Sequence, residues 1–143
     1  MLFIIHYSEN IYEATSDDFD LIKKLIQQFE LDDRDLHYNQ FLVYKKNDEL
    51  LGFGRIRKHN GCDEFCSLGV VESKRFTGIA KELILARLKI ATQPVYLVCI
   101  IPEYFKPLGF KIVNVYPPEI ANKLDYCCSE LVVKEKYVVM KHF

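Results

Sequence analysis

The loop that decides the fold is Arg75-Phe76-Thr77-Gly78-Ile79-Ala80, because the sequence changes its periodicity on either side of it. Before the loop, residues 64–71 predict a β-strand. After it, the apolar residues recur at the spacing of one helix face: Ile79, Leu83, Ile84, Leu88 and Ile90. Residues 95–99 then predict another strand. The loop therefore joins a strand to a helix within a strand–loop–helix–strand unit.

Upstream of this unit, two turns predict three consecutive antiparallel strands. In chain order these are the strand 41–44, the turn 46–49, the strand 50–57, the turn 59–63 and the strand 64–71. The polar cluster Ser16-Asp17-Asp18 is a good N-cap and predicts an amphipathic helix from about residue 17 to 30. The apolar run 1–6 predicts a first strand, and the polar stretch 32–39 could hold a short second helix.

Downstream, shorter elements alternate. A short helix over 102–107 should stop at Gly109, where glycine can take a left-handed cap. The remaining predictions are a strand at 110–115, a helical turn at 119–123 and a last strand at 136–140. This order predicts an α+β fold in which a mixed, mainly antiparallel sheet is flanked by helices and contains one crossover helix.

Length and composition limit the classes of function. The 143 residues are 50% hydrophobic, which suits one domain spanning 1–143. The formal net charge of -1 provides no general attraction for nucleic acid or for an anionic membrane. Residues 1–6 are too short to span a bilayer and lack the features of a signal peptide. The five cysteines, an odd number without export signals, fit reduced thiols in a cytoplasmic protein.

The glycine of the loop predicts an anion site. Gly78, followed by the small Ala80, lies where a strand ends and a helix begins, so the first-turn amides lack partners within the helix. The helix dipole favours an anion there, and Lys74 and Arg75 add full charges. An ordinary strand-to-helix turn is the alternative. The motifs of nucleoside triphosphate and dinucleotide loops are absent from the sequence.

Two motifs in this chain resemble signatures of the GNAT acyltransferase superfamily. Arg75, Gly78 and Ala80 match its cofactor motif, Arg/Gln-x-x-Gly-x-Gly/Ala. The segment 104–110, Tyr-Phe-Lys-Pro-Leu-Gly-Phe, is similar to its second signature, aromatic-Tyr-x-x-Leu-Gly-Phe. The resemblance covers roughly residues 16–116. It implies a sheet that is splayed between the fourth and fifth strands, with acetyl-CoA as co-substrate.

By that resemblance, main-chain groups bind the cofactor at three places. Amides from Arg75 to Ala80, including those of Phe76, Thr77, Gly78 and Ile79, would hold the pyrophosphate. The main chain of Val70 and Val71 would pair with the pantetheine arm like an added strand. Edge groups of Cys99 and Ile100 on the fifth strand would complete the site.

The implied reaction is direct attack by a neutral primary amine on the acetyl carbonyl, with a main-chain amide of the fourth strand stabilising the oxyanion. The family's usual tyrosine acid aligns with Phe105, so Tyr104 or water is the candidate acid. The candidate bases are Glu64 and Glu72, the nearest carboxylates by sequence, although a solvated charge is the commoner role for such residues.

Arg55 and Arg57 share one face of a strand and could bind a substrate carboxylate, with a solvated basic face as the alternative. The segments 55–59, 64–68 and 117–123 resemble the N-acetylglutamate-synthase-like branch, which makes an amino-acid substrate attractive.

Three further expectations remain. A non-catalytic module that binds acyl-CoA or a protein partner is the alternative to an enzyme. The exposed apolar strand at 136–140 is a candidate for pairing across a homodimer edge. His59, Cys62, Cys66, Cys127 and Cys128 lack good zinc-site spacing, so no metal is expected.

Overall fold

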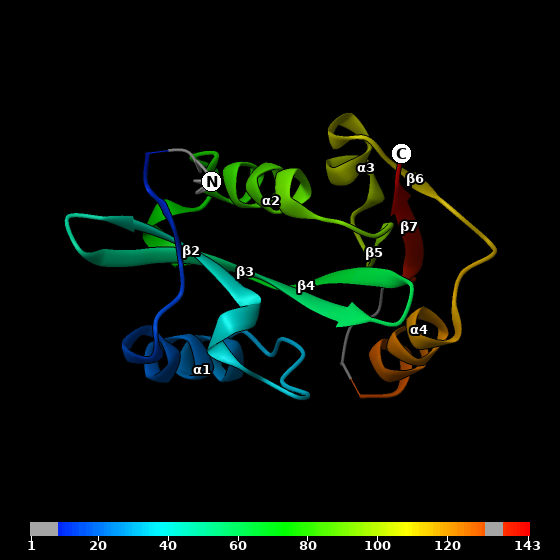
Figure 1. Ribbon diagram of the computed structural model, residues 1–143, viewed down its shortest axis with the longest axis horizontal. Coiled ribbons are helices and arrows are strands. Elements are labelled where there is room, and N and C mark those ends of the chain that lie inside the picture. Colours follow the sequence, from blue (N-terminus) through cyan, green and yellow to red (C-terminus); the bar gives the residue numbers. More distant parts are fainter. Residues whose placement is uncertain (1–8, 131–135) are drawn as a thin grey trace, which may run out of the picture. The chain divides into compact units, whose positions relative to one another are not determined.

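The computed structural model describes residues 9–130 and 136–143 (Figure 1). The strand predicted at 1–6 lies outside the described residues. The chain divides into two compact units. The first comprises Met1–Arg55 and Ser67–Ile90, and the second comprises Ile56–Cys66 and Ala91–Phe143. Whether the chain acts as one domain over 1–143 stays a prediction.

Seven strands are hydrogen-bonded in the order β1-β2-β3-β4-β5-β7-β6. Their bounds are β1 Ile11–Glu13, β2 Phe41–Lys46, β3 Glu49–His59, β4 Cys62–Val70, β5 Val95–Cys99, β6 Phe110–Ile112 and β7 Val138–His142. The pairs β1–β2, β2–β3, β5–β7 and β6–β7 are antiparallel, whereas β4 and β5 run parallel. This confirms the predicted α+β class and its mainly antiparallel, mixed sheet.

The parallel ladder between β4 and β5 is short. It consists of the pairs Asp63↔Val95 and Glu64↔Tyr96. Among the described residues the ladder does not extend beyond the second pair, although β5 continues to Cys99. A parallel ladder that stops after two pairs leaves main-chain groups of β5 free of β4, as expected for a sheet that opens between its fourth and fifth strands.

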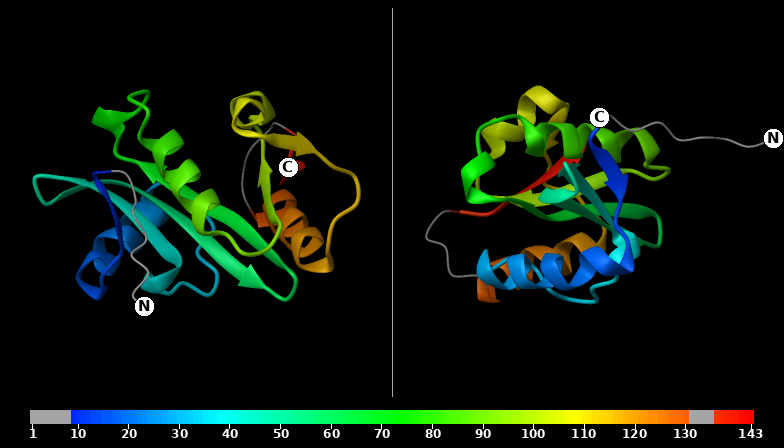
Figure 2. Two further views of the ribbon diagram at one scale, coloured as in Figure 1. Left: turned by 45° about the horizontal axis from the view of Figure 1, so that its top comes forward. Right: turned by 90° about the vertical axis from the view of Figure 1, so that its left-hand side faces the viewer.

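The first unit packs one helix on each face of its strands. The short 3-10 helix η1 Ser16–Asp18 leads into α1 Phe19–Gln28, and α2 Ile79–Ile90 follows the loop. Alternation along β2 separates the two cores: Phe41 and Val43 pack with α1, while Leu42 packs with α2. Figures 1 and 2 show α1 and α2 on opposite sides of β2 and β3.

Glycine and left-handed residues fix two details of this unit. A Cβ on Gly52 would lie 2.9 Å from Ile79 Cγ2, so glycine lets the start of α2 approach β3. The β2–β3 turn has positive φ at both Asn47 (53°) and Asp48 (61°), the residue types that tolerate this conformation in a tight hairpin. The predicted turn at 46–49 is thus confirmed.

The stretch 32–39, which could hold a short second helix, contains no α-helix in the structure. The described chain has only the 3-10 turn η2 Tyr38–Gln40 near that stretch. Asp32 accepts hydrogen bonds from the main chain and side chain of Arg34, and Asp35 has a φ of 52°. Local side-chain bonding and a left-handed residue both oppose a regular helix here.

The second unit comprises the β3–β4 turn, β5, α3 Pro102–Phe105, η4 Lys106–Leu108, β6, α4 Pro118–Glu130 and β7. Its core brings Ile120 of α4 against Tyr96 of β5 and Val139 of β7. Gly109 has a φ of 98° and ends η4, which confirms the predicted left-handed cap. The strand predicted at 110–115 is β6, and it ends at Ile112.

Two predictions in this unit need correction. The helical turn expected at 119–123 is part of the 13-residue helix α4, whose mixed composition hid its length. The terminal strand β7 is not an exposed edge, because it pairs with β5 on one side and with β6 on the other. Its apolar residues are therefore used within the sheet, and β7 offers no free edge for a homodimer.

Within the described residues, none of the helices combines the length and the apolar character that a membrane span requires.

Candidate active site

The predicted cofactor loop lies in the first unit and is open to solvent. After β4, the 3-10 helix η3 Glu72–Lys74 leads to a turn at Arg75 and Phe76, and α2 begins at Ile79. Glu82 N donates to Gly78 O at 3.1 Å, so Gly78 closes the first turn of α2. Gly78 has a φ of 91°, and a Cβ built on it would meet no atom within 4 Å. Gly78 has no side chain that would block the approach of a ligand to the start of α2.

The polar side chains of the loop bind back to the protein. Arg75 Nε donates to Val70 O at 3.2 Å, and its guanidinium lies 5.0 Å from the ring centre of Phe29. Thr77 Oγ1 donates to Lys74 O at 2.5 Å. These contacts fold the loop onto the end of β4 and onto α1, which leaves the main chain of residues 75–80 as the group able to contact a bound anion.

The main chain of the strand end is partly occupied. Val71 N donates to Leu51 O at 2.9 Å, and Val71 O accepts from Lys74 N at 2.9 Å. Val70 O accepts from Arg75, as described above. A pantetheine arm that paired with Val71 would compete with these bonds, so the pairing expected at Val70 and Val71 stays a prediction.

Ser67 interrupts β4 near this end. It has a φ of 49°, which is rare for a residue other than glycine, and it is buried. Its Oγ donates to Asp32 O at 2.8 Å. A left-handed residue within a strand breaks the regular pleat, so β4 changes direction here. Nothing in the sequence marks this position.

Cys99 and Ile100 belong to the second unit. Cys99 ends β5, pairs with Val138 of β7 and places its Sγ 3.7 Å from Met140 Sδ. Burial raises the pKa of the Cys99 thiol, which keeps it neutral and poorly nucleophilic. The predicted role of Cys99 in cofactor binding uses its main-chain groups, so the protonation of the thiol does not affect that prediction.

Tyr104 lies on α3 with its side chain half-exposed, whereas its neighbour Phe105 is buried. The two rings meet edge-to-face at 5.2 Å, and Phe105 also packs on Phe110 at 5.8 Å. Phe105 is therefore a core residue. Of these two neighbours, only Tyr104 has a hydroxyl group that could act as the acid. Burial raises the pKa of Tyr104, so the hydroxyl stays protonated and able to donate a proton.

Glu64 lies at the centre of a buried charge cluster in the second unit. It is fully buried, and its Oε1 lies 2.9 Å from His59 Nε2 and 3.6 Å from Arg57 Nη1. Lys123 Nζ of α4 lies 3.4 Å from Oε2. The Glu64 carboxylate is thus enclosed by three side chains and closed off from solvent, which makes it poorly placed for a base that must reach a substrate. Glu72, by contrast, is exposed on η3.

Sequence reasoning missed Lys123 and His59 as partners of Glu64. The hairpin turn at 60–61 signals that His59 and Glu64 lie near each other on opposed strands, so that contact could have been expected. Lys123 could not, because its helix was expected to be a single turn.

Arg55 is fully buried in the first unit and does not form a solvated face. Its Nε donates to Gln40 Oε1 at 2.8 Å, and its two terminal nitrogens donate to the carbonyls of Asp32 and Arg34. Since Ser67 also donates to Asp32 O, both residues fix the segment that follows α1. This network holds that segment against β3 and β4.

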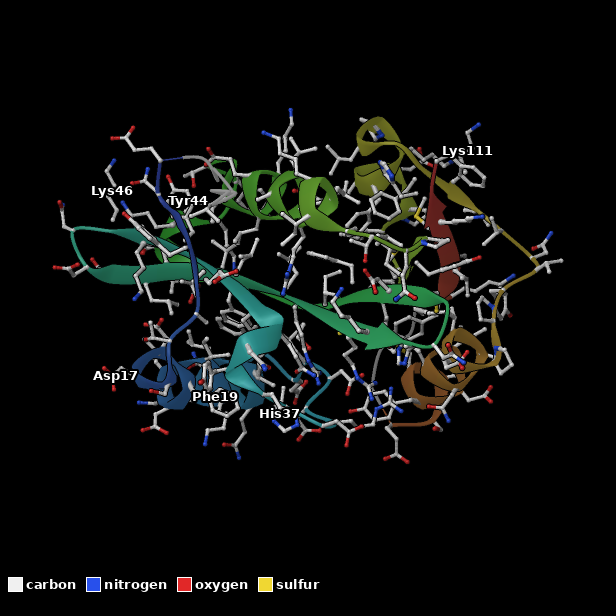
Figure 3. The ribbon with its side chains drawn as sticks, in the orientation of Figure 1. Asp17, Phe19, His37, Tyr44, Lys46 and Lys111 are labelled. Atoms are coloured by element: carbon white, nitrogen blue, oxygen red, sulfur yellow. The ribbon has the colours of Figure 1, made fainter. Side chains whose placement is uncertain are left out.

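A surface hollow of about 420 Å³ in the first unit contains none of the predicted site residues. Its lining is Asn10, Tyr12, Glu13, Thr15, Lys45, Asn47 and Asp48. Tyr44 and Lys46 of the neighbouring strand β2 are labelled in Figure 3, where their side chains are drawn, and Asn10 Nδ2 donates to the Tyr44 hydroxyl at 3.2 Å.

All five cysteines are free thiols. Over residues 9–130 and 136–143, His, Cys, Asp and Glu form no group of three that could hold a metal ion.

Known structures share this fold. Rv2747 from Mycobacterium tuberculosis, solved in complex with CoA and NLQ, is 17% identical with a TM-score of 0.74, over 92% of this chain and 97% of that one. N-acetylglutamate synthase from Neisseria gonorrhoeae, solved with coenzyme A and N-acetyl-glutamate, is 19% identical with a TM-score of 0.71, over 92% of this chain and 34% of that one. Arabidopsis thaliana Naa50, solved with the bisubstrate analogue CoA-Ac-MVNAL, is 17% identical with a TM-score of 0.68, over 93% and 97%.

No curated protein sequence matches the chain significantly. Residues 6–110, however, match the family described as the acetyltransferase (GNAT) family. The match covers both motifs, the loop 75–80 and the segment 104–110. Because it extends over more than half of the 143 residues, this chain belongs to the GNAT acetyltransferase family.

Proposed function

We propose that this protein is an acetyl-CoA-dependent N-acetyltransferase that acts on a primary amine. The observation that carries the proposal is the loop 75–80, in which left-handed Gly78 opens the start of the 12-residue helix α2 to a ligand. The amides at this helix start, with Lys74 and Arg75 beside them, suit a pyrophosphate. Relatives of the same fold were solved with CoA, which supports this ligand.

The proposed reaction needs little from side chains. The amine attacks the acetyl carbonyl directly, its nitrogen forms the new C–N bond, and the C–S bond to coenzyme A breaks. A main-chain amide of β4 stabilises the developing oxyanion, and correct positioning supplies most of the rate. The leaving thiolate has a pKa near that of a free thiol, about 8.5, so it departs readily.

Tyr104 is the proposed acid that protonates the thiolate. Tyr104 is half-exposed, and partial burial raises the pKa of its hydroxyl, which keeps the hydroxyl protonated. For the base, the exposed Glu72 is the better of the two carboxylates, because Glu64 is buried among three basic groups. The proton from the attacking amine then passes to Glu72 or to water.

A small amine that carries a carboxylate, such as an amino acid, is the proposed acceptor class. The resemblance of residues 55–59 to the N-acetylglutamate-synthase-like branch supports it, and one fold relative was solved with N-acetyl-glutamate. Arg57, which is half-buried, is a better candidate ligand for that carboxylate than the enclosed Arg55. Reduced thiols favour a cytoplasmic site of action, and a homodimer would have to use a surface other than β7.

A thiol-release assay tests the proposal. The protein and acetyl-CoA are incubated with a panel of amino acids, polyamines and short peptides, and free coenzyme A is followed with a thiol reagent. Release that depends on one class of amine, with an N-acetylated product by mass spectrometry, would support the enzyme. Binding of acetyl-CoA without release for any amine would favour the non-catalytic alternative, which Phe105 in the usual place of tyrosine also suggests.

A further inference from the structure

Phe76 is the most exposed large apolar side chain among the described residues. Its relative exposure is 105%, and its φ of 66° puts a residue with a Cβ into the left-handed conformation. A wholly exposed aromatic ring gains nothing from folding, and a left-handed non-glycine residue is strained by roughly 1–2 kcal/mol. Neither feature is explained by packing within the first unit.

Basic residues outnumber acidic ones around Phe76 in the sequence, with Lys74, Arg75 and Lys81 against Glu72 and Glu82. Lys74 and Arg75 precede it on the same exposed turn, and Lys81 lies on the exposed part of the first turn of α2. Arg75 and Thr77 direct their polar groups back onto the chain, to Val70 O and Lys74 O, so the ring projects from the loop between them. An apolar aromatic face is thus flanked by cations and by helix-start amides.

This combination matches the chemistry of one end of coenzyme A. The adenine ring offers a flat π-face, and it is flanked by the pyrophosphate on one side and by the ribose 3′-phosphate on the other. Bases stack well on exposed aromatic side chains, and the phosphates suit neighbouring lysine and arginine. A purely apolar partner would not explain the exposed lysines that precede and follow Phe76 in the sequence, Lys74 and Lys81.

We propose that the Phe76 ring is the platform on which the adenine of acetyl-CoA stacks. The inference rests on the proposed function, because it assigns a side-chain role within the same cofactor site. In the pyrophosphate site predicted from the sequence, only the main-chain amide of Phe76 takes part. The ring would add affinity for the nucleotide end of the ligand and none for the acetyl-pantetheine end.

Crossing a protein variant with a shortened ligand tests this assignment. Dissociation constants are measured by calorimetry for acetyl-CoA and for S-acetyl-4′-phosphopantetheine, which lacks the adenosine part. Phe76→Ala should weaken acetyl-CoA binding by about tenfold, the size expected for one base–aromatic stack, and leave the shortened ligand unchanged. Phe76→Tyr should keep the affinity of the native protein.

A fluorescence experiment supplies an independent readout. The chain contains no tryptophan, so Phe76→Trp introduces a single indole reporter on the loop. Acetyl-CoA should quench its emission by stacking, whereas S-acetyl-4′-phosphopantetheine should not. The matched control is Tyr38→Trp, which replaces another half-exposed aromatic residue of the first unit and should respond to neither ligand.

The outcomes separate the two proposals. If the native protein does not bind acetyl-CoA, the proposed function and this inference both fail. If it binds, but Phe76→Ala weakens both ligands equally or neither of them, the adenine platform is overturned while the proposed function stands. A loss confined to acetyl-CoA, together with quenching at position 76 alone, is the expected result.

Discussion

At the scale of single residues, the cofactor loop contains two left-handed positions, and only one of them is glycine. Gly78 adopts its φ of 91° without strain, whereas Phe76 adopts its φ of 66° with a Cβ. The strain at Phe76 is a local property of the loop, because the ring makes no contribution to either core of the first unit.

Replacing Phe76 by glycine should therefore stabilise the protein. We expect a gain of about 0.5–1 kcal/mol in the free energy of unfolding, since relief of the left-handed strain exceeds the added entropy of the unfolded chain. Urea unfolding followed by circular dichroism measures it. Asn47→Gly is the control, with a smaller gain, because asparagine tolerates its φ of 53°. A loss of stability in Phe76→Gly would show that the ring has an internal partner.

The buried Arg55 gives a second prediction about a single residue, which concerns the stability of the protein. Arg55→Gln removes the buried donors to the carbonyls of Asp32 and Arg34 and to Gln40 Oε1, so the protein should lose about 2–4 kcal/mol of stability. Thermal unfolding measures the loss. The half-buried Arg57 is the comparison, and Arg57→Gln should reduce stability less.

Kinetics separate the two possible roles of Arg55. A residue that only holds the segment after α1 should, when replaced, change KM by the same factor for amines with and without a carboxylate. A selective rise for carboxylate-bearing amines would instead make Arg55 a substrate ligand.

At the scale of elements, a capping box fixes the start of η1, the 3-10 turn that leads into α1. Asp18 Oδ2 accepts from Thr15 N at 2.8 Å, and Lys45 Nζ lies 2.7 Å from Asp18 Oδ1. Burial alone would raise the pKa of Asp18, but the bonds from Lys45 and Thr15 outweigh it and hold the pKa below its ordinary value of 3.8. The stability of this helix start therefore depends on the negative charge of the Asp18 carboxylate.

The stability from this carboxylate should depend on pH. Because the pKa is lower in the folded state, the contribution is complete above the ordinary value and is lost as pH falls through the folded pKa. Asp18→Asn should cost about 1 kcal/mol near neutrality, as for loss of a cap, and less at pH 3. Urea unfolding at both pH values measures this, and an equal loss at the two values would contradict it.

The buried cluster around Glu64 joins three elements: Glu64 comes from β4, Lys123 from α4, and Arg57 and His59 from β3. Glu64→Gln leaves Arg57 and Lys123 without this carboxylate, and we expect a loss of about 3–5 kcal/mol. The double variant Glu64→Gln, Lys123→Met should recover part of it, because it removes one of the buried cations. Chemical unfolding of the single and double variants gives the coupling, and strictly additive losses would show that the pair does not interact.

Elements with a clear local signal could be predicted from the sequence. The N-cap cluster predicted α1, the apolar run predicted β5 at Val95–Cys99, and Gly109 predicted the end of η4. The remaining features depend on contacts distant in sequence. Nothing local shows that β7 inserts between β5 and β6, or that Ser67 breaks β4 and bonds to Asp32.

At the scale of the whole molecule, the family match indicates the general class of reaction. The contacts of individual residues supply the predictions that can be tested. The strand-to-helix junction at residues 75–80 was predictable because a glycine and a change of periodicity mark the helix start, and its role in cofactor binding stays a proposal. The partners of Glu64 and the enclosure of Arg55 were not, because they depend on how α4 and the segment after α1 pack. The acceptor site is therefore the part that requires kinetic experiments.

The most direct test of the central claim is a calorimetric titration of acetyl-CoA into the native protein and two glycine variants. Gly78→Trp and Gly61→Trp place the same side chain at glycines with nearly equal φ, 91° and 89°, and with open space around the Cβ. Both variants should therefore lose similar stability. The loop assignment predicts that the native protein and Gly61→Trp bind acetyl-CoA, whereas Gly78→Trp loses most of its affinity. Unchanged affinity in a folded Gly78→Trp variant would contradict it.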